Sequence, residues 1–485
     1  MTDTTTAPTA APAVRFPRMP RRGLLMGLST LRVATLAVGV LALTIGLFAA
    51  GSIGAALSSP VWVTSAVVTF VRWNGRPAIE WAPTLGHFAW RRATGQTSYR
   101  ARPERPRPAG TLALPGDAAS LRFLIDEASG TAMLHDPHAH TLTAIGLVHH
   151  RSFVLLAPGE QAARVQGWSR TLAHLAATGT DTRVQVLEIS LPDSGHGILG
   201  WWQEHCTAKP GTWVVRQWED LVRQVVPAAA THRTLVAVSL DLRTARSQIR
   251  SSGRGIRAAA AFLRQELASF EAGLRSADLF LTKWLGQSDL AALMRTAYEP
   301  GYEQREQHTL DLADAGPLAV EEHWDHIRHD TGHSAVLWIN EWPRVPAPPF
   351  FLHALIFQPG IRKTLSLTCE PVPAQEALRD IRRARVEYAT DSVQKAKLGV
   401  LADLSDSVEA ADVLDRERAL IEGHADIRFT GLVTITAPTH EELEAAIAET
   451  ARAAIQCGCE TRRLYGQQAR AFTAAALPLA RRVSR

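Results

Sequence analysis

One stretch near the N-terminus limits what this chain can fold into more than any other feature. Residues Val33 to Val71 are 39 consecutive residues without an Asp, Glu, Lys, Arg or His, and arginines stand at both ends. One straight helix of that length would reach about 59 Å, nearly twice the ~30 Å hydrocarbon core of a bilayer. The length therefore predicts, within residues 31–72, two antiparallel transmembrane helices joined by a turn near Ala50–Gly54.

Two other interpretations of the run stay open: a single span followed by a re-entrant or interfacial piece, and a cleaved secretory signal. The run is much longer than the apolar core of a signal, about 7–15 residues, and it resumes after Pro60. Lys- and Arg-rich flanks of short segments stay in the cytoplasm, and both flanks here are rich in arginine. We expect a multi-pass protein of the inner (plasma) membrane with its N- and C-termini cytoplasmic.

The positive charge of the chain is concentrated beside this run. Residues 1–110 hold 13 arginines and three acidic residues, a net charge of +10, whereas the rest holds 39 basic and 44 acidic residues, a net charge of −5. The arginines beside the membrane favour contact with anionic lipid. The mildly acidic remainder offers no field for nucleic-acid binding.

The sequence divides into five parts. Residues 1–30 form a basic segment predicted to be disordered, residues 31–72 the apolar hairpin, and residues 73–110 a juxtamembrane segment with an amphipathic piece from Trp81 to Trp90 and a stiff Pro/Arg linker. Residues 111–300 and 301–485 then alternate strand and helix patterns, which predicts an α+β cytosolic domain. The succession is consistent with two related halves, although the sequence contains no clear repeat.

Individual elements of this domain follow from hydrophobic periodicity. Strands are expected at 141–149, 184–191, 234–242, 334–340, 363–369 and 427–436, and helices at 158–177, 256–274, 288–297, 373–397, 407–424, 439–455 and 466–475.

The sequence lacks the loop that cradles nucleotide phosphates. That loop requires G-x-x-x-x-G-K-[ST], and the nearest segment, Pro359–Thr364, lacks the second glycine, which should stand directly before the lysine. Gly253-Arg254-Gly255 precedes a helix pattern but lacks the third glycine of a dinucleotide-binding loop, so a helix cap is the better interpretation. We therefore expect no ATP hydrolysis, and we assign neither catalytic nor cofactor-binding residues.

Histidines are the main candidates for metal chemistry. Two clusters occur: His135, His138 and His140, and His323, His326, His329 and His333. On a helix, His326 with His329 and His329 with His333 would share a face, which would suit zinc or iron. The second segment is polar and contains no known metal-binding pattern, so we expect a solvated face and assign no metal ligands.

The cysteines indicate reduced thiols in a cytosolic domain. Four scattered cysteines do not form a secreted disulfide framework. Cys457-Gly458-Cys459 lacks the second pair that a redox or metal motif would need.

Two stretches resemble components of conjugation machines. The apolar hairpin followed by Gly75-Arg76-Pro77 and Glu80-Trp81 resembles the small membrane hairpin proteins of the PrgI type in Gram-positive conjugation systems. The later region resembles the N-terminal, non-motor domain of the conjugation ATPases of type IV secretion systems. That second likeness rests on Trp338–Arg344, on the acidic helices before Gly431–Thr436, and on Gln467–Pro478. Together they look like an actinobacterial family of membrane proteins found with secretion or conjugation components.

The resemblance implies a structural role. It implies an inner-membrane scaffold subunit, not an enzyme, that contacts membrane lipid, forms homo-oligomers and docks a separately encoded type IV secretion ATPase. Trp201-Trp202 and Glu341-Trp342 are candidate contact segments, although most of these tryptophans are expected to fill cores. Two alternatives remain: a membrane-anchored enzyme with a metal at the second histidine cluster, and a membrane adaptor unrelated to secretion.

Overall fold

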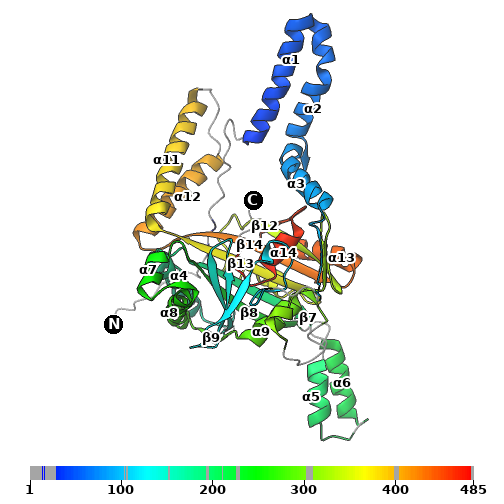
Figure 1. The fold of residues 1–485 in the computed structure, drawn as a ribbon, viewed down its shortest axis with the longest axis vertical. Helices are drawn as coiled ribbons and strands as arrows, with labels where there is room; N and C mark the ends of the chain where they lie inside the picture. The colour runs from blue at the N-terminus through cyan, green and yellow to red at the C-terminus, as the bar shows by residue number, and fades with distance from the viewer. Residues whose placement is uncertain are drawn as a thin grey trace, which may run out of the picture. The chain divides into compact units, whose positions relative to one another are not determined.

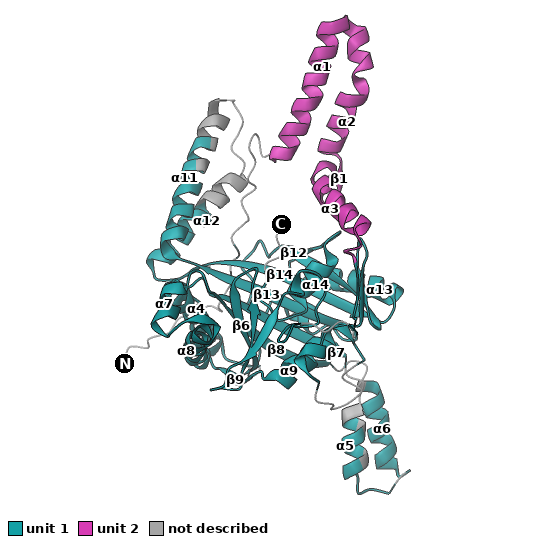
Figure 2. Ribbon diagram, viewed as in Figure 1, with its two compact units in different colours: residues 1–16, 98–485 teal, residues 17–97 magenta. Residues whose placement is uncertain are grey.

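The computed structural model describes residues 14, 16, 29–102, 104, 108–150, 153–192, 196–209, 211–225, 230–301, 310–397 and 404–481. Most of the segment expected to be disordered, 1–30, and part of the expected linker, residues 103 and 105–107, lie outside the described residues. Val14 is described, and it pairs with Ala347 through two backbone hydrogen bonds of 2.8 and 3.0 Å. The chain forms two compact units, residues 17–97 and residues 1–16 with 98–485 (Figure 2).

The smaller unit is built around a long apolar helix. Helix α1 (Thr30–Leu57) leaves helical geometry at Ala50 and Gly51, where Gly51 has a φ of +57°. Helix α2 (Ser59–Phe70) follows and packs against α1. Glycine adopts a positive φ at little cost, so the chain can reverse there. Helix α1 is long and apolar enough to cross a membrane, whereas α2 is apolar but shorter.

Small residues allow the backbones of this arm to approach closely. A Cβ added to Gly39 would lie 2.7 Å from Ser65 Oγ, and one added to Gly46 would lie 2.5 Å from the carbonyl oxygen of Gly54. Ser65 Oγ donates a hydrogen bond to the carbonyl of Thr35. Substituting a larger residue at these glycines would force apart the helical segments before and after Gly51.

Tryptophans gather in the segment after α2. Strands β1 (Arg72–Trp73) and β2 (Arg76–Pro77) pair antiparallel, and the 3₁₀ helix η1 (Ala78–Trp81) leads into α3 (Ala82–Ala93). The Trp81 indole donates to the Trp73 carbonyl at 3.1 Å, and the two rings are 4.9 Å apart. Most of the amphipathic segment expected from Trp81 to Trp90 is therefore helical.

A 13-stranded sheet organises the larger unit (Figure 1). Its order is β3-β10-β11-β12-β14-β13-β7-β8-β6-β5-β4, with β15 paired to β12 and β9 paired to β6. After β3 (Ser98–Arg100) and η2 (Gly116–Ala118), the first run of elements is β4 (Arg122–Ile125), β5 (Ala132–Asp136), β6 (Thr141–His150), α4 (Pro158–Ala177), β7 (Arg183–Pro192), α5 (His196–His205), α6 (Trp213–Val225), β8 (Ala230–Asp241), α7 (Arg246–Ser251), α8 (Gly255–Ser276), β9 (Leu279–Trp284) and α9 (Gln287–Tyr298).

A second run of elements completes the sheet. It comprises η5 (Leu312–Asp314), β10 (Ala319–Glu322), β11 (Ile327–His329), β12 (Gly332–Glu341), α10 (His353–Ile356), β13 (Arg362–Val372), α11 (Ala374–Lys397), α12 (Leu404–Ile421), β14 (Asp426–Ala437), α13 (His440–Gln456), β15 (Glu460–Arg463) and α14 (Gln468–Ala475). The mixed α+β class predicted from the sequence is observed.

The two runs pair their strands in the same way. In the first, β6 pairs with β8 and β9, and β8 pairs with β7. In the second, β12 pairs with β14 and β15, and β14 pairs with β13. Each run places two helices between the second and third strands of this set: α5 and α6 between β7 and β8, and α11 and α12 between β13 and β14. Antiparallel pairing of β7 with β13 joins the runs into one sheet.

Alternating side chains along the strands build three cores. On one face of the sheet, residues of both runs, such as Leu187 and Val336, pack with α9 and α14. On the other face, the strands of the first run, including Val238, pack with α4 and α8, and those of the second run, including Val433, pack with α10 and α13. One face therefore carries a core shared by the two runs.

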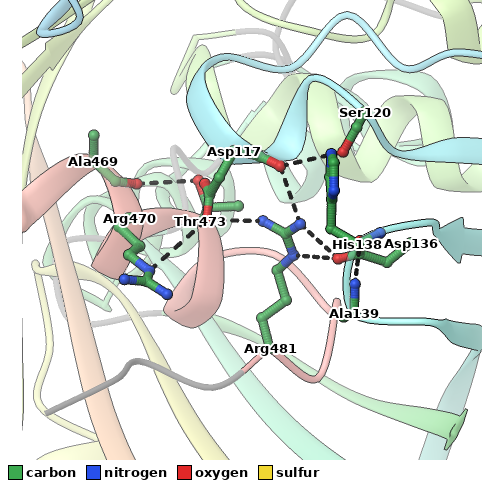
Figure 3. Close-up of polar contacts among 9 residues, drawn as sticks. All are labelled: Asp117, Ser120, Asp136, His138, Ala139, Ala469, Arg470, Thr473 and Arg481. Carbon is green, nitrogen blue, oxygen red and sulfur yellow. Dashed lines mark hydrogen bonds and ion pairs between the residues drawn. The ribbon is translucent and has the colours of Figure 1, made fainter.

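The segment after α14 is held in the shared core. Leu477 and Leu479 are buried, and the buried Gln185 side chain donates to the Ala474 carbonyl at 2.8 Å and accepts from the Ala480 N–H at 2.6 Å. Arg481 then lies between Asp117 and Asp136 (Figure 3).

Candidate metal centre

Three histidines distant in sequence meet beside the strands of the second run. His326 lies in the turn between β10 and β11, His333 on β12, and His440 at the first residue of α13. One ring nitrogen from each lies within 4.8 Å of the others. The ring centroids are 4.4 Å apart for His326 and His440, 5.5 Å for His326 and His333, and 6.2 Å for His333 and His440.

Strand pairing accounts for this meeting. Strand β11 returns antiparallel along β12, so Arg328 lies opposite His333. On the other side of β12, His333 lies opposite Ala437, the last residue of β14. Helix α13 begins three residues later, capped by the Thr439 hydroxyl, which accepts the Glu442 N–H at 3.2 Å. The pairing of β12 with β14 therefore places the first turn of α13 next to His333.

Carboxylates lie beside two of the three rings, those of His326 and His440. Asp325 Oδ1 lies 2.8 Å from His326 Nδ1. Glu444 lies one helical turn after His440, and Asp325, His440 and Glu444 also present ligand atoms within 4.8 Å of one another. Arg463 donates to Glu444 at 2.8 Å and to Asp325 at 3.5 Å. The arrangement thus joins three imidazoles, two carboxylates and one guanidinium.

Burial sets the protonation of the central rings. Desolvation lowers the pKa of His326, although Asp325 opposes that effect, and desolvation also lowers the pKa of His333, assisted by the neighbouring histidines and Arg328. Burial by itself would raise the pKa of Asp325, but the hydrogen bond and charge interaction with His326, a backbone hydrogen bond and Arg463 together outweigh it, and the pKa is lowered. The rings are therefore neutral near pH 7, which is the form that binds a metal ion.

One nitrogen of the cluster lacks a protein partner. Among the described residues, His333 Nδ1 is a buried nitrogen without a hydrogen bond. An unsatisfied buried polar atom costs free energy and calls for an explanation, such as an ion or a water molecule. The ring next to it, His326, is only 8 % exposed, whereas His440 is exposed. The cluster is therefore open on the side of α13.

The structure excludes the helical arrangement considered for the second histidine segment and corrects the expectation of a solvated face. Residues 323–333 form a turn, β11 and the start of β12 instead of a helix. His329, which would share a face with its neighbours on a helix, is fully buried away from the cluster. It contacts the Tyr298 carbonyl and lies 2.7 Å from Ser334 Oγ. The solvated face expected there is also wrong, since His326 and His329 are both buried.

Sequence reasoning missed His440. It lies more than a hundred residues from the histidine-rich segment, and the pairing of β12 with β14 that brings it close is not visible in local periodicity. A weak local signal does exist, because His440 and Glu444 are four residues apart at the start of a predicted helix and so share a face. His323, which belongs to the histidine-rich segment itself, stacks on His326 with ring centroids 4.5 Å apart.

The other sequence candidates have backbone or core roles. Asp136, between the histidines of the first segment, accepts the N–H groups of His138 and Ala139, each at 3.0 Å, in the turn after β5. Gly253 and Gly255 have φ values of +130° and +79° before α8, which fits a helix cap. Pro359–Thr364 turns at Gly360 (φ +73°) into β13.

All four cysteines are free, as expected. Cys457 and Cys459 are buried against α10 and α13. Burial raises the pKa of the Cys457 thiol and raises that of Cys459 to about 12, so both stay protonated and are poor metal ligands.

The candidate contact tryptophans differ in exposure. Trp201 is 59 % exposed and stacks on His205, whereas Trp202 packs against Trp218. Trp342 packs among aromatic rings, including Phe351. Trp201 alone of these three is available for a partner.

No protein-family model matches this chain, and the search of curated proteins returned no match to it.

Proposed function

We propose that the protein is a membrane-anchored structural subunit of a type IV secretion-like machine. It forms homo-oligomers, and its α+β domain docks a separately encoded ATPase on the cytoplasmic side of the inner membrane. The observation that carries the proposal is an apolar helical arm whose large side chains are exposed, joined to a polar domain with its own cores. The secretion context comes from the resemblance described above.

The exposure of α1 supports membrane insertion. Phe48 is 94 % exposed, Ile53 70 % and Leu57 76 %. Placing such side chains in water forfeits roughly 1.5–3 kcal/mol each relative to burial, so hydrocarbon is the better solvent for the arm. From Thr30 to Ala49 the helix would span about 30 Å, the thickness of a bilayer core.

We propose that the helical segment after Gly51 also crosses the membrane. From Ser52 to Phe70 it would span about 28 Å, including the step between α1 and α2. Helices in lipid associate through small residues that allow close approach, as Gly39 and Ser65 do here. Arg32 at the open end donates to the Thr69 carbonyl at 3.3 Å, and arginines with Trp73 and Trp81 mark the expected membrane interface.

The α5–α6 pair is the proposed docking surface for the ATPase. Val215, Trp218 and Val222 form the inner side of α6, where Trp218 meets Trp202. The outer side exposes Trp213 (69 %), Val214 (60 %) and Leu221 (50 %), and Trp201 of α5 is exposed as well. Exposed apolar patches of this kind are typical of protein contacts.

The equivalent pair, α11 and α12, is polar. Arg385 of α11 donates to Glu417 of α12 at 2.9 Å, and Arg428 of β14 pairs with Glu376 and Asp380. Polar residues of this kind suit the rim of an interface. We propose that the helices within residues 373–424 form part of the rim of the contact with the ATPase.

Co-purification tests the proposal. The full chain is expressed with a type IV secretion ATPase from the same genome, solubilised in mild detergent and captured by a tag on the chain. We expect the ATPase to co-purify, and the double substitution Trp213→Ser with Leu221→Ser to abolish its capture. Arg223→Ser, at an exposed position on a different face of the same helix, is the matched control. An ATPase retained equally by the double variant would contradict docking through α5–α6.

Topology is tested separately. Reporter fusions or cysteine labelling at residues 10, 52 and 200 should place residue 52 outside and the other two in the cytoplasm. Deleting residues 111–485 should leave membrane insertion intact and abolish ATPase recruitment. A reporter at residue 200 found outside would refute the orientation, and an ATPase still recruited by the hairpin alone would refute the docking role.

A membrane-anchored metalloenzyme is the second candidate. It is favoured by the meeting of His326, His333 and His440, with an open side at α13. Loss of secretion in a docking variant that keeps its histidines would support the scaffold, whereas loss of secretion in His440→Ala with the ATPase still bound would support the enzyme.

A further inference from the structure

We infer that His326, His333 and His440 form a binding site for a divalent transition metal of the zinc class, with Glu444 as the carboxylate ligand. The site ties the start of α13 and the turn before β11 to β12. It is a structural clamp within the second run of the sheet, independent of the docking surface on α5–α6.

The donor set selects the metal. Three imidazole nitrogens with one carboxylate oxygen suit Zn²⁺ and its neighbours, whereas Mg²⁺ and Ca²⁺ require oxygen ligands. The thiols of Cys457 and Cys459 lie in the α10–α13 core and are not part of the set. Zinc is therefore the first choice, with Co²⁺ and Ni²⁺ as close substitutes.

The spacing requires only small side-chain movements. With Zn–N bonds of about 2.0–2.1 Å, the nitrogens of a tetrahedral site lie about 3.3 Å apart. The histidine nitrogens here lie within 4.8 Å of one another, so a closure of about 1.5 Å brings the three imidazoles onto one ion. A Glu444 oxygen lies within 4.8 Å of a His440 nitrogen, so Glu444 reaches the ion from the His440 side. His440 is exposed at the helix start, His326 directly precedes β11, and His333 lies on β12.

A carboxylate already orients one ligand. Asp325 Oδ1 holds His326 Nδ1 at 2.8 Å, which leaves Nε2 of that ring for the metal. Metal-binding histidines nearly always have such a partner on the second nitrogen. The buried, unpartnered His333 Nδ1 is the complementary observation, because a metal ion would satisfy a nitrogen that no described protein group satisfies.

Arg463 balances the charge when the metal is absent. It contacts both Glu444 and Asp325, at 2.8 and 3.5 Å. A carboxylate has two oxygens, so Glu444 can bind the metal through one and keep Arg463 on the other. The positive end of α13 and Arg328 oppose a cation, and the two carboxylates offset them.

Metal content and the Co²⁺ spectrum test the site. The full chain, carrying no histidine tag, is purified in detergent, stripped with a chelator, and equilibrated with limiting Zn²⁺. We expect close to one tightly bound zinc per chain and a rise in the thermal unfolding midpoint on adding Zn²⁺. With Co²⁺ we expect the visible absorption of a tetrahedral N/O site, without the near-ultraviolet band of thiolate ligands.

Four variants separate this site from chance binding. His440→Ala and His333→Ala should lose the tightly bound zinc, and Asp325→Asn should weaken zinc binding roughly 10- to 100-fold. His424→Ala, at an exposed histidine after α12, should bind zinc as the wild type does. His440 is exposed, so the metal-free His440→Ala protein should unfold at the wild-type temperature, which keeps the comparison valid. Equal zinc in wild type and His440→Ala, or thiolate bands with Co²⁺, would overturn the inference.

Discussion

Arg481 Nη2 lies 2.6 Å from Asp136 Oδ2, so the last described residue of the chain is ion-paired to the end of β5. Both side chains are largely buried, 14 % and 5 % exposed. Burial by itself would raise the pKa of Asp136, but the Ala139 N–H and Arg481 outweigh it and the pKa is lowered. Arg481 also donates to the Asp117 carbonyl at 3.2 Å (Figure 3). The first run of elements thereby holds the end of the second.

We predict that breaking this pair destabilises the larger unit. Asp136→Ala should lower the free energy of unfolding by about 2–4 kcal/mol, because it removes the closer and more buried of the two carboxylates that pair with Arg481 and leaves the guanidinium with Asp117 at 3.4 Å. Asp136→Asn should cost somewhat less, since the amide oxygen can still accept the turn N–H groups. Chemical denaturation in detergent, followed by tryptophan fluorescence, measures the change.

Arg223→Ala is the control for that prediction. Its ion pairs with Glu219 and Asp220, each at 3.5 Å, are exposed, so the expected cost is about 0–1 kcal/mol. An Asp136→Ala cost no larger than that of Arg223→Ala would show that the Asp136–Arg481 pair does not hold the C-terminal segment.

A second prediction concerns Gln185, which is fully buried on β7. Its amide donates to Ser366 Oγ at 2.8 Å as well as to the Ala474 carbonyl, and its oxygen accepts from Ala480. Gln185→Leu leaves these groups unsatisfied, and each costs about 1–3 kcal/mol. We expect a lower unfolding midpoint and faster proteolysis after residue 476. Gln375→Leu, at an exposed position of α11, should change neither.

Local patterns predicted the elements better than their partners. The apolar run 334–340 lies within β12, and the helix expected at 158–177 is α4 with the same bounds. The expectation of a solvated face at 323–333 was wrong. His326, His329 and His333 match helical spacing by coincidence, whereas Asp330 adopts a positive φ of +36° and turns the chain between β11 and β12. A short hairpin with polar residues gives little periodicity to distinguish it from a helix.

Long-range pairing was beyond the reach of the sequence. The candidate metal site depends on β12 lying beside β14, and the joining of the two runs depends on β7 lying beside β13. Both pairings follow from the complete sheet, not from any one strand. Nothing in the sequence around His440 therefore indicated that it lies near His326. The position of the apolar helix α1 could be predicted, because its signal is one long continuous run of uncharged residues.

A third prediction concerns pH and His329. Burial lowers its pKa from 6.5 to about 4, with the Tyr298 carbonyl acting in the opposite direction. Between these values the unfolded chain binds a proton that the folded chain does not, so folding stability falls as the pH falls from about 6.5 to 4. The loss is at most roughly 3 kcal/mol. Above pH 6.5 this histidine contributes no pH dependence.

Comparing His329→Gln with the wild type isolates that effect. The variant cannot take up the proton, so its unfolding free energy should decline less between pH 6.5 and 4.5 than that of the wild type. The measurements are made with a chelator present, so that metal binding does not contribute. His424→Gln, at an exposed histidine, should follow the wild-type curve. Parallel curves for wild type and His329→Gln would contradict a buried, neutral His329.

The last prediction concerns the packing of α4 on α8. Gly167 of α4 faces the end of α8 so closely that an added Cβ would lie 2.7 Å from Ala277 Cα and 2.8 Å from the Ser276 carbonyl oxygen. Both of these are backbone atoms, which cannot rotate away. Alanine favours helix by up to about 1 kcal/mol over glycine, but the clash must push the helices apart and loosen the core around Leu172 and Phe270. We therefore expect Gly167→Ala to destabilise the protein by about 1–3 kcal/mol.

Gly159→Ala, in the first turn of the same helix with nothing within 4 Å of the added Cβ, is the matched control and should be neutral or slightly stabilising. If both variants were equally stable in thermal unfolding, α4 and α8 would not pack at this distance.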